Sequence, residues 1–239
     1  MRASFQGFPQ QGFEFLRELE LNNERQWFDA HKATYTEVVK PAVAALVSSA
    51  GAALMKFAPA YVTEPKKAIY RIYRDTRFSP NKTPYKTNVG ALFFRADLGK
   101  NEASAFYVEI SPKHVGIAGG CYMPDAERLR LIRAHIAEHH ARLASMLRAK
   151  ALVASMGQLQ GDRLSRPPKG FPPDHPAIEL LKAKQWYYWR ELPPETALSP
   201  RLVTEIVSRF QLMLPVVEFL NEPLAAARKL RAPLETGWV

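Results

Sequence analysis

The highest density of chemically reactive side chains lies between residues 70 and 86, in the sequence YRIYRDTRFSPNKTPYK. This segment holds five Arg and Lys residues and four Tyr and Phe residues around a single aspartate, Asp75. Guanidinium groups bind phosphate and carboxylate oxygens through two parallel hydrogen bonds, a geometry that lysine cannot reproduce. The sequence therefore predicts a binding cluster for a phosphorylated or other anionic ligand: Arg71, Arg74, Asp75, Arg77, Lys82, Tyr85 and Lys86.

Side-chain alternation divides this segment into two faces if residues 68–78 form a β-strand. One face would then carry Arg71, Tyr73, Asp75 and Arg77. Asp75 is expected to hold Arg71 or Arg77 in place. The other face is mostly apolar and should pack on the core, and Arg74 interrupts it. Because a guanidinium that points inward is unfavourable without a partner, we expect a bulge, a carboxylate or a pocket at Arg74.

Three functions are compatible with these residues. The leading hypothesis is a binding protein for a phosphorylated small molecule, with nucleic acid as the alternative partner. The second is a phosphoester hydrolase or transferase that uses Asp75 or Glu109 as a base or metal ligand. In the third, the motif is a buried salt-bridge network with a purely structural role. The sequence assigns no catalytic residue, and we expect no cofactor and no bound metal.

Other chemically suggestive motifs are weaker. The sequence HIAEH, from His135 to His139, matches the spacing of a zinc-binding helix, with Glu218 as the nearest analogue of a third ligand. The apolar stripe of that helix leaves Glu138 nearly opposite the core, which disfavours a metal site. Cys121 follows a diglycine turn, and the sequence around it provides no obvious activating histidine.

Aromatic side chains that could stack on nucleobases occur in two places. They are Trp27 on the apolar stripe of a helix, and the run Trp186, Tyr187, Tyr188 and Trp189. The position of Trp27 is more typical of a core residue.

Positive charge is concentrated in two segments. Residues 64–113 carry ten basic and five acidic side chains, and residues 141–184 carry eight and three. Together they account for the whole net charge of +10. Clustered positive charge indicates either a polyanionic or phosphorylated partner or a surface that keeps the protein soluble.

Hydrophobic periodicity indicates helical, then sheet-forming, then helical parts. Helices are predicted at 9–21, 23–57 and 125–155, and from residue 200 onward with an interruption near Pro215. Strands are predicted within 67–120 and at 186–192. The pattern predicts an α+β fold with an antiparallel sheet of about four or five strands covered by helices from both chain ends. We expect a single domain, 1–239.

Composition also bears on location. The single cysteine excludes an internal disulfide framework and fits a reducing compartment. The first residues lack the continuous apolar segment of a signal peptide, and no run approaches the roughly 18 uninterrupted apolar residues of a membrane span. We therefore expect a cytoplasmic protein without a membrane partner.

The motif also carries a resemblance to a known family. The pattern R-x-x-R-D-x-R-F-x-x-N-K-x-x-Y consists of Arg71, Arg74, Asp75, Arg77, Phe78, Asn81, Lys82 and Tyr85. It resembles the signature of a widespread bacterial family of conserved hypothetical proteins, a domain of unknown function of about 230 residues. Supporting similarity occurs near the N-terminus, at GGCYMP (119–124) and at PPKGFPPDHPAIELLK (167–182). The resemblance singles out these positions without assigning roles to them.

Overall fold

The computed structural model describes residues 4–231 and confirms the predicted α+β class. Within this range four strands form one antiparallel sheet in the order β1-β2-β3-β4. They are β1 (Val89–Phe93), β2 (Ala105–Ile110), β3 (Val115–Cys121) and β4 (Trp186–Leu192). The first three form a meander, and the chain adds a helical segment before it returns as β4.

Helices come from both ends of the chain, as predicted. Those before the sheet are α1 (Gln10–Leu21), α2 (Arg25–Thr34), α3 (Lys40–Leu54) and α4 (Pro65–Ala68). Between β3 and β4 lie α5 (Ala126–Glu138), α6 (His140–Leu147), α7 (Lys150–Met156) and α8 (Ile178–Leu181). The described chain ends in the long helix α9 (Leu202–Arg231).

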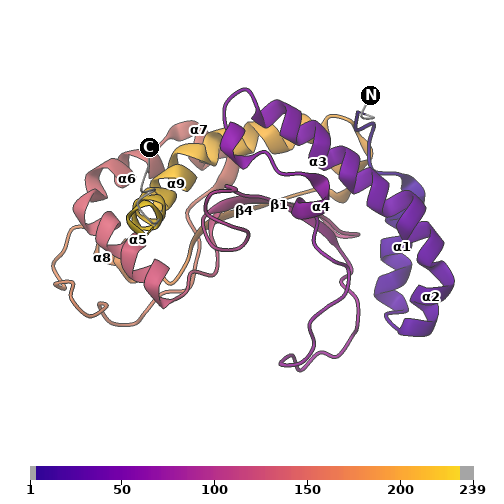
Figure 1. Cartoon of the computed structure of the whole chain (residues 1–239), viewed down its shortest axis with the longest axis horizontal. Coiled ribbons are helices and arrows are strands. Elements are labelled where there is room, and N and C mark those ends of the chain that lie inside the picture. Colours follow the sequence, from indigo (N-terminus) through magenta and orange to yellow (C-terminus); the bar gives the residue numbers. More distant parts are fainter. Residues whose placement is uncertain (1–3, 232–239) are drawn as a thin grey trace, which may run out of the picture.

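The protein has the shape of an arch with the sheet under its crown (Figure 1). Helices α3 and α9 lie over one face of the sheet, α1 and α2 descend at one end, and α5, α6 and α8 descend at the other. Tight packing fixes α9 on the sheet: a Cβ at Gly119 would lie 2.8 Å from Met213 Sδ, and the Phe106 and Phe210 rings stack 4.6 Å apart. The second face of the sheet, here called the open face, lies inside the arch.

The interruption predicted near Pro215 is wrong, because α9 is helical through both Pro215 and Pro223. A proline inside a helix leaves the carbonyl four residues earlier without its usual donor. For Pro215 that carbonyl belongs to Gln211, and both residues are exposed. Water can therefore hydrogen-bond the freed carbonyl, and the helix continues.

One helical run, Arg25–Leu54, passes a test of length and composition for a membrane span. It comprises α2, a π-helical turn (Tyr35–Val39) and α3. Buried core helices of proteins that do not span a membrane can be equally long and apolar. Here Val43, Leu46 and Val47 of the run are buried in the core.

Candidate functional site

The motif segment forms an irregular hairpin, here called the basic ribbon (residues 70–86). Arg74 N donates to Pro84 O at 2.9 Å, and Lys86 N donates to Ile72 O at 2.8 Å. Tyr73 and Tyr85 form an isolated β-bridge. The regular strand predicted for residues 68–78 is therefore wrong. The partner stretch contains Pro80 and Pro84, which lack the amide hydrogen that a continuous ladder needs.

Side-chain alternation nevertheless survives along the first half of the basic ribbon. Ile72 is buried and Arg74 is half-buried, whereas Arg71 and Asp75 are exposed. The pattern ends at Phe78, which continued alternation would place on the same face as Ile72 and which is 93% exposed. The ribbon leaves the sheet before this point and extends away from it (Figure 1).

Asp75 forms a two-pronged surface ion pair with Arg77. Arg77 Nε donates to Asp75 Oδ1 at 3.0 Å, and Nη2 donates to Oδ2 at 2.8 Å. Hydrogen bonding to Arg77 lowers the pKa of Asp75 to about 2. This confirms one of the two expected partners of Asp75. Because both side chains are largely exposed, the pair is not part of a buried salt-bridge network.

Lys82 lies at the same exposed tip of the ribbon. Its Nζ donates to Thr76 O at 2.9 Å, which closes the tip on itself. Asp75, Arg77 and Lys82 are thus separated from the other predicted site residues, which lie nearer the sheet.

Arg74, Asn81, Tyr85 and Lys86 border a concave space of about 460 Å³, here called the basic hollow, whereas Arg71 is exposed and does not line it. The basic hollow lies between the basic ribbon, the end of α1 and the turn that joins β2 to β3. Its lining includes Glu20, Asn23, Arg74, Asn81, Thr83, Tyr85, Lys86, Asn88, Glu109, Lys113 and His114. The structure therefore brings Arg74, Tyr85 and Lys86 of the predicted cluster to one space.

Asn23 and Phe28 hold the wall of the basic hollow in place. The Asn23 amide donates to Tyr85 O and accepts from Tyr85 N, both at 3.0 Å. These are the two backbone hydrogen bonds that a neighbouring strand would otherwise make with Tyr85. The Tyr85 ring stacks on Phe28 at 4.1 Å and is 3% exposed. Tyr85 therefore supports the wall from the core side, and its ring is not free to stack on a ligand.

Two cations of the basic hollow form no ion pair within the described residues. Arg74 is half-buried, and its Nη1 donates to Thr83 O at 3.3 Å and to the Thr83 hydroxyl. Lys86 Nζ lies 5.0 Å from the centre of the Tyr70 ring. Burial, and then the charge of Arg71, lower the pKa of Lys86, with Glu109 opposing. Arg74 thus lines a pocket, as expected, and no carboxylate of residues 4–231 pairs with it.

The other charges of the basic hollow are compensated. Lys113 pairs with Glu20 across its rim. Glu109 accepts hydrogen bonds from His114 Nε2 and the Tyr107 hydroxyl, each at 2.8 Å, and from the Asn88 amide. The Glu109 side chain is only 12% exposed. The excess positive charge of the basic hollow is therefore carried by Arg74 and Lys86.

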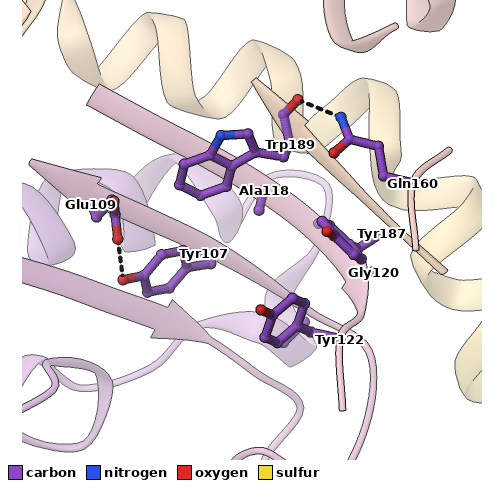
Figure 2. A pocket seen from close by; sticks show the side chains of 10 residues that line it. Tyr107, Glu109, Ala118, Gly120, Tyr122, Gln160, Tyr187 and Trp189 are labelled. Atoms are coloured by element: carbon purple, nitrogen blue, oxygen red, sulfur yellow. Dashed lines mark hydrogen bonds between the residues drawn. The ribbon is translucent and has the colours of Figure 1, made fainter. Parts of the chain in front are cut away.

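A second hollow of about 460 Å³ lies on the open face, here called the aromatic groove. Its lining includes Ala105, Tyr107, Glu109, Ala118, Gly120, Tyr122, Gln160, Tyr187 and Trp189. Figure 2 shows Trp189 and Tyr107 on one side, Tyr187 and Tyr122 on the other, the small residue Ala118 between them, and Gly120 beside Tyr187.

Two glycines allow the large rings to lie against the sheet. A Cβ at Gly90 would lie 2.3 Å from the Tyr107 hydroxyl oxygen, and one at Gly116 would lie 2.2 Å from the Trp189 ring. Only glycine leaves this space. Among the predicted stacking residues, Tyr187 and Trp189 face the aromatic groove, whereas Trp186 and Tyr188 are buried on the core face.

The HIAEH motif does not assemble a metal site. His135 Nε2 lies 3.1 Å from Glu222, Glu138 is exposed, and Glu218 pairs with Arg95 at 3.1 Å. Within residues 4–231 no group of three His, Cys, Asp or Glu side chains is arranged to hold a metal ion. The His135–Glu222 contact instead joins α5 to α9, and the Arg95–Glu218 ion pair joins the β1–β2 connection to α9.

Cys121 is 3% exposed at the end of β3, and burial raises the pKa of its thiol to about 12. The neutral thiol is a poor nucleophile. Trp27 stacks on His31 at 4.0 Å and packs against the core, as its helical position predicted.

The fold and site together define a class: an α+β protein whose sheet is covered by helices on one face and carries a basic hollow and an aromatic groove on the other side. Residues 11–219 match the model of a family described as conserved hypothetical protein (DUF2461), and the chain belongs to that family. This confirms the predicted membership of a family of conserved hypothetical proteins. No curated protein and no solved structure matched the chain.

Proposed function

We propose that the protein binds a phosphorylated ligand in the basic hollow. The observation that carries this proposal is the presence of two half-buried cations, Arg74 and Lys86, without an ion pair in the described part of the chain. A buried charge is unfavourable unless a counter-charge or hydrogen bonds compensate it. A phosphate group would supply both.

The pKa of Lys86 supports an anionic ligand. Burial and the charge of Arg71 lower it, so the ammonium is held where its charge is disfavoured. A phosphate dianion within contact distance favours the charged ammonium and raises its pKa again. Arg74 adds a guanidinium with both Nε and Nη2 free of hydrogen bonds to the described residues, which is the edge that binds two oxygens.

The shape of the basic hollow favours a single phosphate group over a long polymer. A surface that follows a nucleic-acid backbone needs several cations spread along it. Here Arg77 is engaged by Asp75, and Lys82 binds the backbone of its own ribbon. The two half-buried cations, Arg74 and Lys86, share a space of about 460 Å³, within the range of small-molecule sites, and Arg71 is exposed outside its lining.

A second candidate function is phosphoester hydrolysis or transfer in the same basic hollow. The observation that favours it is the contact between Glu109 and His114 Nε2, 2.8 Å apart, with both side chains on the lining. A carboxylate that orients an imidazole is a recurrent general-base arrangement. Asp75 is no longer a candidate base because it lies at the exposed tip of the ribbon. Release of inorganic phosphate in the titration below would reveal such an activity.

The test is calorimetric titration of the purified protein with ribose 5-phosphate. The double variant Arg74→Gln/Lys86→Gln should bind at least about tenfold more weakly, because it loses two charge-assisted contacts. Arg77→Gln/Lys82→Gln removes the same number of positive charges from the same ribbon and should change the affinity less than about threefold.

Thermal melting of each variant confirms that it is folded before titration. Absence of binding by the unaltered protein at millimolar ligand would overturn the proposal. An equal loss of affinity in both double variants would also overturn it, because the effect would then reflect net charge and not the basic hollow.

A further inference from the structure

The aromatic groove is lined by four aromatic side chains. Tyr107 and Trp189 border it on one side, and Tyr122 and Tyr187 border it on the other (Figure 2). Between them the sheet offers the small residue Ala118, so a ring can approach the strands closely there.

The positions of the rings are fixed by their neighbours. The Tyr107 hydroxyl donates to Glu109, and burial together with Glu109 raises the pKa of Tyr107, so this phenol stays protonated. Tyr122 and Tyr187 meet edge to face with ring centres 5.0 Å apart. Trp189 Nε1 donates to Glu191 at 3.1 Å. Tyr107 is thus held firmly, whereas Tyr122 is 58% exposed. A wall that is in place before binding reduces the entropy lost when a ligand is bound.

The aromatic groove also has a polar group near one end. Gln160 Nε2 donates to Trp189 O at 3.2 Å, which fixes the orientation of its amide. Within the described residues the Gln160 side-chain oxygen has no hydrogen-bond donor, so it can accept from a ligand. An aromatic slot with an amide at its edge fits a nucleobase, which has a π-face and exocyclic donors.

The aromatic groove and the basic hollow meet at Glu109, which lines both. The two hollows are therefore neighbours, and a ligand with its phosphate beside Arg74 and Lys86 enters the aromatic groove only if it extends past Glu109. In a nucleotide the part next to the phosphate is a ribose followed by a flat base.

We infer that the ligand is a nucleotide unit, with its phosphate in the basic hollow and its base between the rings of the aromatic groove. This inference rests on the proposed phosphate site and adds the substrate class. Free nucleotides and the ends of nucleic-acid chains share this unit.

The experiment compares the affinities of AMP, ribose 5-phosphate and adenosine by calorimetry. AMP should bind on the order of tenfold more tightly than ribose 5-phosphate, because stacking of one base adds that much. Trp189→Leu should reduce the affinity for AMP to about the affinity for ribose 5-phosphate. The affinity for ribose 5-phosphate itself should not change. Trp27→Leu, which removes a tryptophan outside the aromatic groove, should preserve the preference for AMP.

The outcomes separate the two proposals. If ribose 5-phosphate binds and AMP binds no better, the aromatic groove does not take a base, and the phosphate site stands. If adenosine binds but AMP and ribose 5-phosphate do not, both the proposed phosphate site and the inference of a nucleotide are wrong. A short oligoadenylate that binds more tightly than AMP, with an affinity that falls steeply with salt, would identify a nucleic-acid end as the source of the unit.

Discussion

Replacing Asn221 by alanine is expected to lower the free energy of unfolding by about 4 kcal/mol, because buried polar groups lose their partners. Asn221 of α9 is fully buried. Its amide accepts from Ser104 N at 2.8 Å and donates to Ser104 O and the Tyr61 hydroxyl, both at 2.9 Å. One side chain thus joins α9, the start of β2 and the segment after α3. Denaturant unfolding measures the loss.

A matched control for this prediction exists on the same helix. Gln211 is exposed, so Gln211→Ala removes an amide of similar chemistry without leaving a buried group unpaired. It should change stability by less than about 0.5 kcal/mol. Equal effects of the two substitutions would show that Asn221 does not hold α9 on the sheet.

The second large effect is expected at Gly120, in the floor of the aromatic groove. Its φ is +133°, and an added Cβ would lie 2.2 Å from Trp186 O of the neighbouring strand. Gly120→Ala combines backbone strain with a collision against backbone, which cannot rotate away. We expect a loss of about 4 kcal/mol or more in unfolding free energy.

Gly157→Ala separates these two causes. Gly157 also has a positive φ, +76°, but an added Cβ there meets nothing within 4 Å. Strain alone should lower the unfolding free energy by roughly 1–3 kcal/mol. If Gly120→Ala has no larger effect than Gly157→Ala, then β3 and β4 are not as close as described.

The sequence predicted those features that depend on local periodicity. The helical blocks, the meander of β1 to β3 and the strand at Trp186–Leu192 follow from the spacing of apolar residues. The same reasoning failed for residues 68–78, where alternation is present but the partner stretch contains Pro80 and Pro84. Strand formation depends on the partner, which local periodicity does not describe.

The candidate site was predictable only in part. Clustered charge identified Arg74 and Lys86, but it also selected Arg77 and Lys82, which the fold places at the exposed tip. Asn23 and His114 were missed because they lie far from the motif in sequence and reach it only through the tertiary fold. Similarly, the register that places Tyr107 and Trp189 on one face follows from the pairing of three strands.

The central claim, a phosphate group beside Lys86, is tested most directly by the pKa of that lysine. Lysine side-chain NMR, with Lys86→Arg to assign the resonance, gives the pKa with and without inorganic phosphate. In the free protein the pKa of Lys86 should lie below its ordinary value, because burial and Arg71 disfavour the ammonium. Saturating phosphate should raise it, and Arg74→Gln, but not Arg77→Gln, should reduce that rise. An unchanged Lys86 pKa at saturating phosphate would contradict the account.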